Sequence, residues 1–497
     1  MELASFTDIV AGLGAALSVQ VFLWSAIGVF IGCVFGAAPG LTATAGVAIA
    51  TPLTFGVSFD QSMSLLLGIY CGGYFAGSVP AILVNTPGAP GNAATTVDGY
   101  PMAQKGRADL ALALAIAGSF IGGIFSGAIL LLLAPALSAL AFTFTAVEYA
   151  SFGIFGLVCV AAISGGSILR GCIAATFGML LGCVGIDPVD GAIRLTFGMP
   201  QLLTGVPLIP ALIAFFAITE MLNQGGAGTM HELPPQQSTN LAEIIRLFIK
   251  HKWVALKSGL IGAGIGILPG TGPTIASWVS YSEAARFDCP DEEPLGQGAP
   301  RGIIASEVAN NAVTGGAMVP LLTLGIPGDT VTAILLGALT IQNIAPGPLF
   351  ILEHGDLFVL IVCILMLSNI WLLLFGMSLR PLLPKMLKLP MNVLVPLIGV
   401  MAATGCFADG NSAFSVALMG VLGVAGYYLQ CLGLPMAPMV LGLVLGPIIE
   451  KNLRDALTVH KMDVTVFITR PISAVLMAIT VLTIVLTIRK VSAKKAA

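Results

Sequence analysis

Long apolar runs recur along the chain, and each is close to the length that a membrane-spanning helix needs. Such a helix takes roughly 20 mainly apolar residues. There are thirteen such runs, but several contain Gly or Pro and need not cross the membrane, so about twelve spans are expected. The pattern therefore predicts an all-α, polytopic membrane protein. The runs begin near residues 15, 61, 108, 147, 167, 203, 257, 302, 356, 391, 412, 433 and 471.

The composition agrees with a chain that lies mostly within a bilayer. Hydrophobic residues make up 57% of it and charged residues only 9%, with a mean hydropathy of +0.99. Soluble domains carry about 25% charged residues. The first residues, "MELASFTDIV", lack the basic segment of a cleavable signal peptide, so the first apolar helix is expected to insert and stay.

Two halves of the chain share one pattern of glycine and proline. "GVFIGCVFGAAPG" (28–40) and "GAGIGILPG" (262–270) both place Gly at steps of four with Pro before the last, at an offset of 230 residues. "SVPAILVNTPG" (78–88) and "MVPLLTLGIPG" (318–328) share their Pro and Gly positions at an offset of 240. The ten extra residues fit the acidic loop 287–298, which has no counterpart in the first half. The chain is interpreted as a duplication.

The predicted organisation is a first membrane repeat over 1–223, a central polar linker over 224–256 and a second membrane repeat over 257–497. Inverted topology is preferred, because broken helices of the two repeats then face each other across an axis in the membrane plane. A parallel repeat stays open. The Gly steps of four also have a purely structural interpretation, since small residues let membrane helices approach closely.

The Pro–Gly elements predict helices that are interrupted within the membrane. Non-helical backbone survives there only when it is buried in protein or lines a watery cavity, and paired interruptions in two repeats indicate the central site of a transporter. Interfacial turns are the alternative. The predicted substrate-binding residues are Asn85, Thr86, Pro87, Gly88, Asn310, Asn311, Gly325, Pro327 and Gly328, and the predicted sodium-binding residues are Pro39, Gly40, Thr42, Gly270, Thr271, Asp329 and Thr330.

The polar chemistry favours transport of an anion over catalysis. Lys and Arg are almost absent from the apolar runs, so helix N-termini, each with about half a positive charge, are expected to hold the anion. No P-loop occurs and no His lies inside a span, so no enzyme, catalytic residue, bound metal site or cofactor is predicted, apart from sodium as a coupling ion. Asp329 has two interpretations: an N-cap of a helix over Thr330–Ile341, or a carboxylate that helps to hold a cation.

Basic residues gather in clusters that predict the orientation. Lys105 and Arg107, the stretch 246–257, the stretch 380–388 and the tail 489–495 should face the cytoplasm by the positive-inside rule. The stretch 451–470, with four basic residues, falls outside on this scheme. Nine scattered cysteines lack metal-type spacing and are expected to act as small buried hydrophobes.

Three segments carry a resemblance to a known family. "ILVNTPGAPGNAATTVDGYPMAQKGRADLAL" (82–112), "SEVANNAVTGGAMVPLLTLGIPGD" (306–329) and "LLGALTIQNIAPGPLF" (335–350) resemble the large membrane subunit of the tripartite tricarboxylate transporters. The likeness runs through nearly the whole chain. It supports Asn85–Gly88, Glu307, Asn310, Asn311 and Gly325–Gly328 as site residues. Ala89 and Asp329 depart from the family pattern at the proposed site.

The resemblance implies a permease of the bacterial inner membrane with about twelve spans. It would work with a small four-helix membrane subunit and a periplasmic solute-binding protein, and an ion gradient, sodium above all, would drive the uptake of citrate-like carboxylates. The alternative is an autonomous channel or exporter of small organic anions that uses the same broken helices as a pore.

Overall fold

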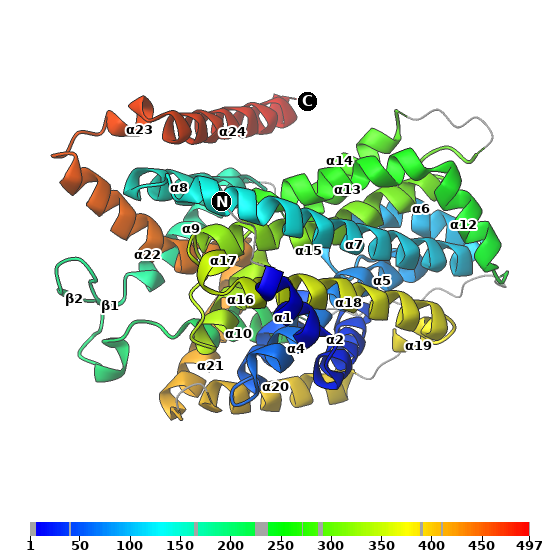
Figure 1. The fold of residues 1–497 in the computed structure, drawn as a ribbon, viewed down its shortest axis with the longest axis horizontal. Helices are drawn as coiled ribbons and strands as arrows, with labels where there is room; N and C mark the ends of the chain where they lie inside the picture. The colour runs from blue at the N-terminus through cyan, green and yellow to red at the C-terminus, as the bar shows by residue number, and fades with distance from the viewer. Residues whose placement is uncertain are drawn as a thin grey trace.

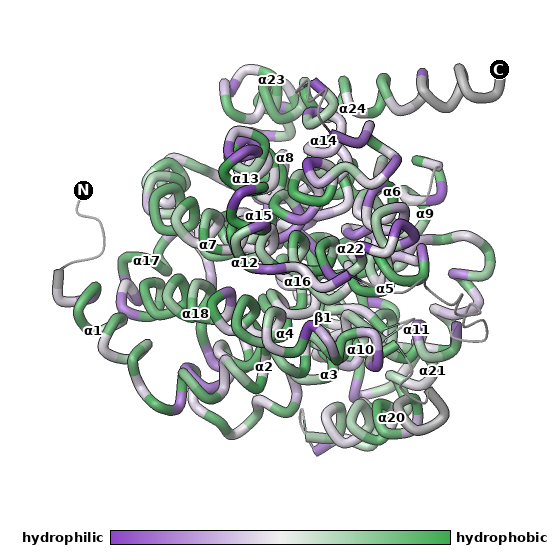
Figure 2. The backbone as a smooth tube through the Cα atoms, turned by 90° about the vertical axis from the view of Figure 1, so that its right-hand side faces the viewer, coloured by the Kyte–Doolittle hydropathy of each residue, from purple (hydrophilic) through white to green (hydrophobic). Residues whose placement is uncertain are grey.

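The protein is a bundle of α-helices joined by short connections, with one small β-hairpin (Figure 1). The structure, a computed structural model, describes residues 6–38, 41–163, 167–223, 237–270, 272–286, 292–387, 391–408 and 411–496. Hydrophobic residues line nearly all of the helices, α2, α7 and α18 among them (Figure 2). Six helices in the described part are long and apolar enough to cross a membrane.

Each predicted apolar run contains a helix. This confirms the expected all-α, polytopic membrane fold. Some of these helices are shorter than a full span, in keeping with the Gly and Pro that interrupt the runs. The helices are α2 (Val19–Ala37), α4 (Phe59–Ala76), α7 (Ala108–Ala141), α8 (Ala146–Ile163), α9 (Ile168–Gly182), α10 (Leu208–Ile213), α13 (Lys252–Ile267), α15 (Pro300–Leu324), α18 (Gly355–Leu379), α20 (Met391–Ala408), α21 (Ala413–Cys431), α22 (Met436–Val459) and α24 (Pro471–Ala496).

Shorter elements connect these helices or complete them. They are α1 (Phe6–Ala16), α3 (Ala43–Leu53), α5 (Ser78–Val84), η1 (Pro90–Asn92), α6 (Ala93–Met102), η2 (Ala103–Arg107), β1 (Gly185–Ile186), β2 (Ile193–Arg194), η4 (Pro200–Leu202), η5 (Ala214–Ile218), α11 (Thr219–Asn223), α12 (Leu241–Lys250), α14 (Gly272–Ala284), α16 (Thr330–Ile341), α17 (Phe350–Glu353), α19 (Leu383–Met386) and α23 (Val466–Thr469).

The glycine steps hold two helix pairs at close range. A Cβ on Gly32 of α2 would lie 2.5 Å from the carbonyl oxygen of Ile69 on α4. A Cβ on Gly262 of α13 would lie 2.4 Å from the carbonyl oxygen of Ala309 on α15. Gly262 follows Gly32 by 230 residues and Ala309 follows Ile69 by 240, which are the two offsets of the sequence repeat. The two pairs therefore make equivalent contacts.

Helices α7 and α18 run in opposite directions. Figure 1 shows α7 running from the end of the bundle near α6 and α12 toward α8, whereas α18 runs from α17 toward α19, which lies beside that same end. The basic residues Lys105, Arg107, Lys250 and Lys385 belong to elements at this end. The β1–β2 hairpin lies at the opposite end.

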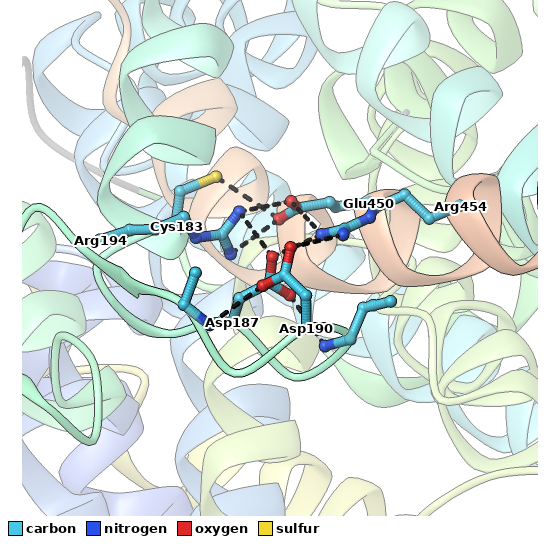
Figure 3. A network of polar contacts seen from close by, with 8 residues as sticks. Cys183, Asp187, Asp190, Arg194, Glu450 and Arg454 are labelled. Carbon is cyan, nitrogen blue, oxygen red and sulfur yellow. Dashed lines mark hydrogen bonds and ion pairs between the residues drawn. The ribbon is translucent and has the colours of Figure 1, made fainter.

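An ion-pair network fastens the β1–β2 hairpin to α22 (Figure 3). Arg194 donates to Glu450 at 2.6 Å, and Arg454 pairs with Asp187 and with Asp190, the latter at 3.0 Å. Asp187 is 3% exposed and also accepts from the backbone N–H of Val189 at 2.8 Å. That hydrogen bond, with the Arg454 pair, lowers the pKa of Asp187 from 3.8 to about 2.

Candidate functional site

A cavity of about 470 Å³ lies where the two halves of the chain meet. Ligand pockets typically measure roughly 300–1,000 Å³, so its size suits a small molecule. Its walls come from segments of both halves that carry the predicted interruptions. They include Thr42, Ala43, Thr44, Tyr74, Ala89, Pro90, Gly91, Asn92, Gly270, Gly272, Pro273, Thr274, Asn310, Asp329 and Thr330, with Val160, Phe215, Phe216, Glu220, Gln430, Pro435, Met436, Ala437 and Leu441 on the other walls.

Four helices begin at this cavity. They are α3 and α14, which correspond at an offset of about 230, and α6 and α16, which correspond at an offset of 240 when η1, which leads into α6 from Pro90, is included. Residues at or next to the N-terminus of each helix line the cavity. A helix N-terminus carries about half a positive charge. Asp329 already caps α16 with a carboxylate and Thr42 caps α3 with a neutral hydroxyl, so the ends of α3, α6 and α14 are the ones that favour a negatively charged occupant.

The helix breaks that produce these N-termini are built alike in both halves. Helix α5 ends at Asn85 with φ 55°, and α15 ends at Gly325 with φ 69°, both in the left-handed region. The N–H of Thr86 donates to the carbonyl of Pro80 at 3.3 Å, and the N–H of Ile326 donates to that of Pro320 at 3.2 Å. This is the six-to-one hydrogen bond of a Schellman C-cap. The paired Pro–Gly strings thus give paired helix ends.

The predicted substrate residues of the second half lie at or behind the cavity. Asn310 lines it and donates to the carbonyl of Tyr74 at 3.0 Å. The buried amide of Asn311 has no hydrogen-bond partner among the described residues. Pro327 and Gly328 are buried and Gly325 is half-buried, and the carbonyl of Gly328 accepts from the N–H of Gly270 at 2.7 Å.

The predicted substrate residues of the first half are not part of the cavity wall. Asn85, Thr86 and Pro87 are exposed and are not among the residues that line the cavity. Gly88 is half-buried, and a Cβ there would lie 2.5 Å from the carbonyl oxygen of Gly36. The chain re-enters the cavity only after this break, so Ala89–Asn92 occupy the place that Asn85–Gly88 were predicted to hold.

Four of the seven predicted sodium residues belong to the cavity wall. Thr42, Gly270, Asp329 and Thr330 all line it, whereas Pro39, Gly40 and Thr271 lie outside the described residues. The hydroxyl oxygens of Thr44 and Thr330 are 3.4 Å apart and join the first half to the second.

Asp329 makes the N-cap of α16, as one of its two interpretations requires. Its Oδ1 accepts from the N–H of Thr332 at 2.8 Å, and the Thr332 hydroxyl accepts from the N–H of Asp329 at 2.8 Å. Its Oδ2 accepts from the hydroxyls of Tyr70 and Tyr74, each at 2.6 Å. The carboxylate is 2% exposed and is held entirely by neutral donors in these contacts.

Sequence reasoning missed these two tyrosines. Tyr70 and Tyr74 stand four residues apart on α4, so they share one face of the helix. Two hydroxyls at that spacing within an apolar run were the available signal. Glu220 and Gln430 on the cavity wall carried no comparable signal, since each stands alone at the end of an apolar helix.

The cavity is acidic in its side chains. Asp329 and Glu220 line it, and none of the described residues on its wall is Lys, Arg or His. Positive potential there comes from the backbone at the helix N-termini.

Comparison with known proteins identifies the family. A family model described as the tripartite tricarboxylate transporter TctA family matches residues 22–441. The chain belongs to this family. The resemblance inferred from the Pro–Gly–Asn strings is confirmed, and the protein is a multi-pass membrane protein of a transporter family rather than of an enzyme family.

Two proteins of Agrobacterium vitis are similar to the chain. An uncharacterized 52.8 kDa protein in the TAR-I ttuC' 3' region is 36% identical over 468 residues, which cover 94% of this chain and 93% of that protein. An uncharacterized protein in the TAR-II ttuC' 3' region is 39% identical over 225 residues, 45% of this chain and 93% of that protein. No solved structure matches the chain.

Proposed function

We propose that the protein carries small di- and tricarboxylates across the bacterial inner membrane through this cavity, by secondary-active uptake coupled to sodium. It acts as the large membrane subunit, with a small four-helix membrane subunit and a periplasmic solute-binding protein as partners. The observation that carries the proposal is the convergence of four helix N-termini on one cavity in a chain of the tricarboxylate transporter family.

The helix N-termini supply enough attraction for a carboxylate. Each interacts with a negative charge by roughly 0.3–1 kcal/mol at exposed sites and up to ~2 kcal/mol in partly buried ones. The three ends without an acidic cap, those of α3, α6 and α14, give on the order of 3 kcal/mol at about 1 kcal/mol each, a factor of roughly a hundred and fifty in affinity. Ends of α3 and α6 from the first half and of α14 and α16 from the second would face carboxylates at two sides of one molecule.

The acidic side chains of the cavity favour a mechanism in which a cation binds together with the anion. A carboxylate that enters beside Asp329 and Glu220 is repelled unless positive charge enters with it. Thr42, Thr330 and Gly270 also line the cavity, and hydroxyl and carbonyl oxygens are the kind of ligand that sodium prefers in broken-helix transporters.

The two repeats, 1–223 and 257–497, would move against each other during transport, with 224–256 as the linker. The equivalent α2–α4 and α13–α15 contacts support this division. The opposite directions of α7 and α18 support its inverted form.

Uptake of radiolabelled carboxylates into proteoliposomes tests the proposal. We expect accumulation only with an inward sodium gradient and with the small subunit and the binding protein present. Asn310→Ala should reduce the initial rate at least about tenfold, the effect of losing about 1.4 kcal/mol of binding, while Asn452→Ala on α22 should not. Sodium-independent equilibration without partners would favour the channel or exporter alternative and overturn this function.

A further inference from the structure

Glu307 is a carboxyl group enclosed by the helices behind the cavity. It lies on α15, is 0% exposed and contacts α6 and α7. Its Oε1 accepts from the amide of Asn92 at 3.2 Å and contacts the hydroxyl of Thr95, and its Oε2 accepts from the hydroxyl of Ser119 at 3.1 Å. The same Asn92 lines the cavity, as does Asn310, which also hydrogen-bonds to Glu307, so these two amides lie between the carboxyl group and the cavity.

No positive charge compensates this carboxyl group in the described part of the chain. The contacts from α6 and α7 are hydroxyls, those of Thr95 and Ser119, and η1 contributes the amide of Asn92. Titratable groups on the elements around α15 are engaged elsewhere: Tyr74 of α4 with Asp329, and Asp98 of α6 with Tyr281 of α14 and with backbone N–H groups. Arg301, earlier on α15, pairs with Glu292 at 3.5 Å.

The hydrogen bonds around Thr95 leave room for a proton on Glu307. The hydroxyl of Ser306 reaches the carbonyls of Gly302 and Ile303, at 3.0 and 3.1 Å, which can only accept. Thr95 lies 3.0 Å from the Ser306 oxygen and also contacts Glu307, and its single proton can serve only one of these two oxygens. If that proton goes to Ser306, the contact between Thr95 and Glu307 takes its proton from Glu307. An ionised carboxylate in a buried enclosure without compensating positive charge is also strongly disfavoured.

We propose that Glu307 is a proton-binding residue of the transport cycle, protonated in this conformation and ionised when Asn92 turns away and water reaches it from the cavity. The O–H bond forms on one side of the membrane and breaks on the other, so that one proton crosses with each anion. This inference rests on the proposed function, and it adds a second cation, at a site apart from the sodium residues at Asp329.

Infrared spectroscopy of the purified full-length protein tests the protonation without any transport. We expect a carboxylic-acid C=O stretching band at neutral pH that shifts in D₂O and is absent from Glu307→Gln. Gln keeps the shape and the polar contacts of a protonated Glu. Glu353→Gln, the same change at an exposed residue of α17, should leave the band in place. Absence of the band in the wild-type protein, or its persistence in Glu307→Gln, would overturn the proposal.

Proteoliposome uptake then tests the coupling. A pH difference of one unit, acid outside, should raise wild-type accumulation by up to about tenfold for one proton per anion. Glu307→Gln should lose this response while still exchanging internal for external carboxylate, which shows that it folds and binds. A wild-type protein without a response, or a variant that keeps it, contradicts the coupling. If no carboxylate moves at all while the infrared band is present, the proposed function fails and protonation of Glu307 stands.

Discussion

Asp329 illustrates how one buried carboxylate can serve structure and transport together. Four contacts from neutral groups surround its two oxygens, two from Thr332 and one each from Tyr70 and Tyr74. The Thr332 contacts cap α16 and orient its N-terminus toward the cavity. Oδ2, held by rotatable hydroxyls, is the atom that a sodium ion would approach from the cavity side.

Asp329→Asn separates the two roles. Asn keeps an oxygen for the cap, which is worth about 1 kcal/mol, but removes the charge. If Asp329 holds sodium, the sodium concentration for half-maximal uptake should rise several-fold, corresponding to about 1 kcal/mol, with a thermal midpoint close to that of the wild-type protein. Uptake at varied sodium measures this, with Asp455→Asn on α22 as the matched control. A sodium response identical to that of the wild-type protein would show that Asp329 serves only as the N-cap of α16.

At the scale of elements, the fold depends on helices that touch through their backbones. The equivalent contacts of α2 with α4 and of α13 with α15 leave no room for a side chain at Gly32 or Gly262. Such packing by small residues is how membrane helices gain contact without a hydrophobic driving force between them. The glycine steps therefore serve packing, and the helix breaks that follow them serve the cavity.

Two glycines of α13 give a matched test. In Gly262→Ala the new Cβ would lie 2.4 Å from a backbone oxygen, so α13 and α15 must separate, at a cost of about 1–3 kcal/mol. Gly264→Ala, two residues on, meets no atom within 4 Å and should be neutral or stabilising by up to about 1 kcal/mol. Thermal unfolding in detergent measures both. Equal midpoints for the two variants would contradict close packing at Gly262.

The β1–β2 hairpin gives a pH-dependent prediction. Because the folded pKa of Asp187 is depressed to about 2, its ion pairs are present above its ordinary pKa of 3.8 and are lost as the pH falls through about 2. Hydrogen–deuterium exchange of the amides of Ile186 and Asp187, corrected for intrinsic rates, should accelerate only within that window. In the Asp187→Asn variant, the same two amides should exchange rapidly above pH 3.8 as well. Unchanged protection in Asp187→Asn would show that α22 does not fasten the hairpin.

At the scale of the whole molecule, the two halves touch each other in the wall of the cavity. Thr44 and Thr330 meet there, and a Cβ on Gly91 would lie 2.9 Å from a side-chain carbon of Pro273. Transport by two moving repeats requires these contacts to break and re-form, because the substrate must reach both sides of the membrane.

A cross-link across the cavity tests this movement. With the exposed Cys172 and Cys431 replaced by Ser, a Thr44→Cys, Thr330→Cys double variant should lose most of its uptake on treatment with a short bifunctional thiol reagent. Cleavage of the reagent should restore the uptake. Each single variant should be insensitive to the reagent, which controls for modification alone. Undiminished transport in the cross-linked double variant would show that the halves do not separate here.

The sequence by itself determined which segments are helices, where they break and which breaks correspond. These are local properties: the apolar run sets the transfer free energy of a segment, and the Pro–Gly strings at 87–88 and 327–328 interrupt it. The matched C-caps at Asn85 and Gly325 follow from this, as does the cap at Asp329. The family also follows, because its Pro–Gly–Asn strings are contiguous in the chain.

Only the tertiary structure decided which of those residues share a cavity. Asn85 and Gly325 end their helices alike, yet Asn85 is exposed and Gly325 half-buried, and Ala89–Asn92 take the place at the cavity. The donors to Asp329 include Tyr74, 255 residues away, and those to Glu307 include Asn92, 215 residues away. Such partners meet only when helices from both halves pack, and their identity depends on the packing geometry rather than on any local preference of the chain.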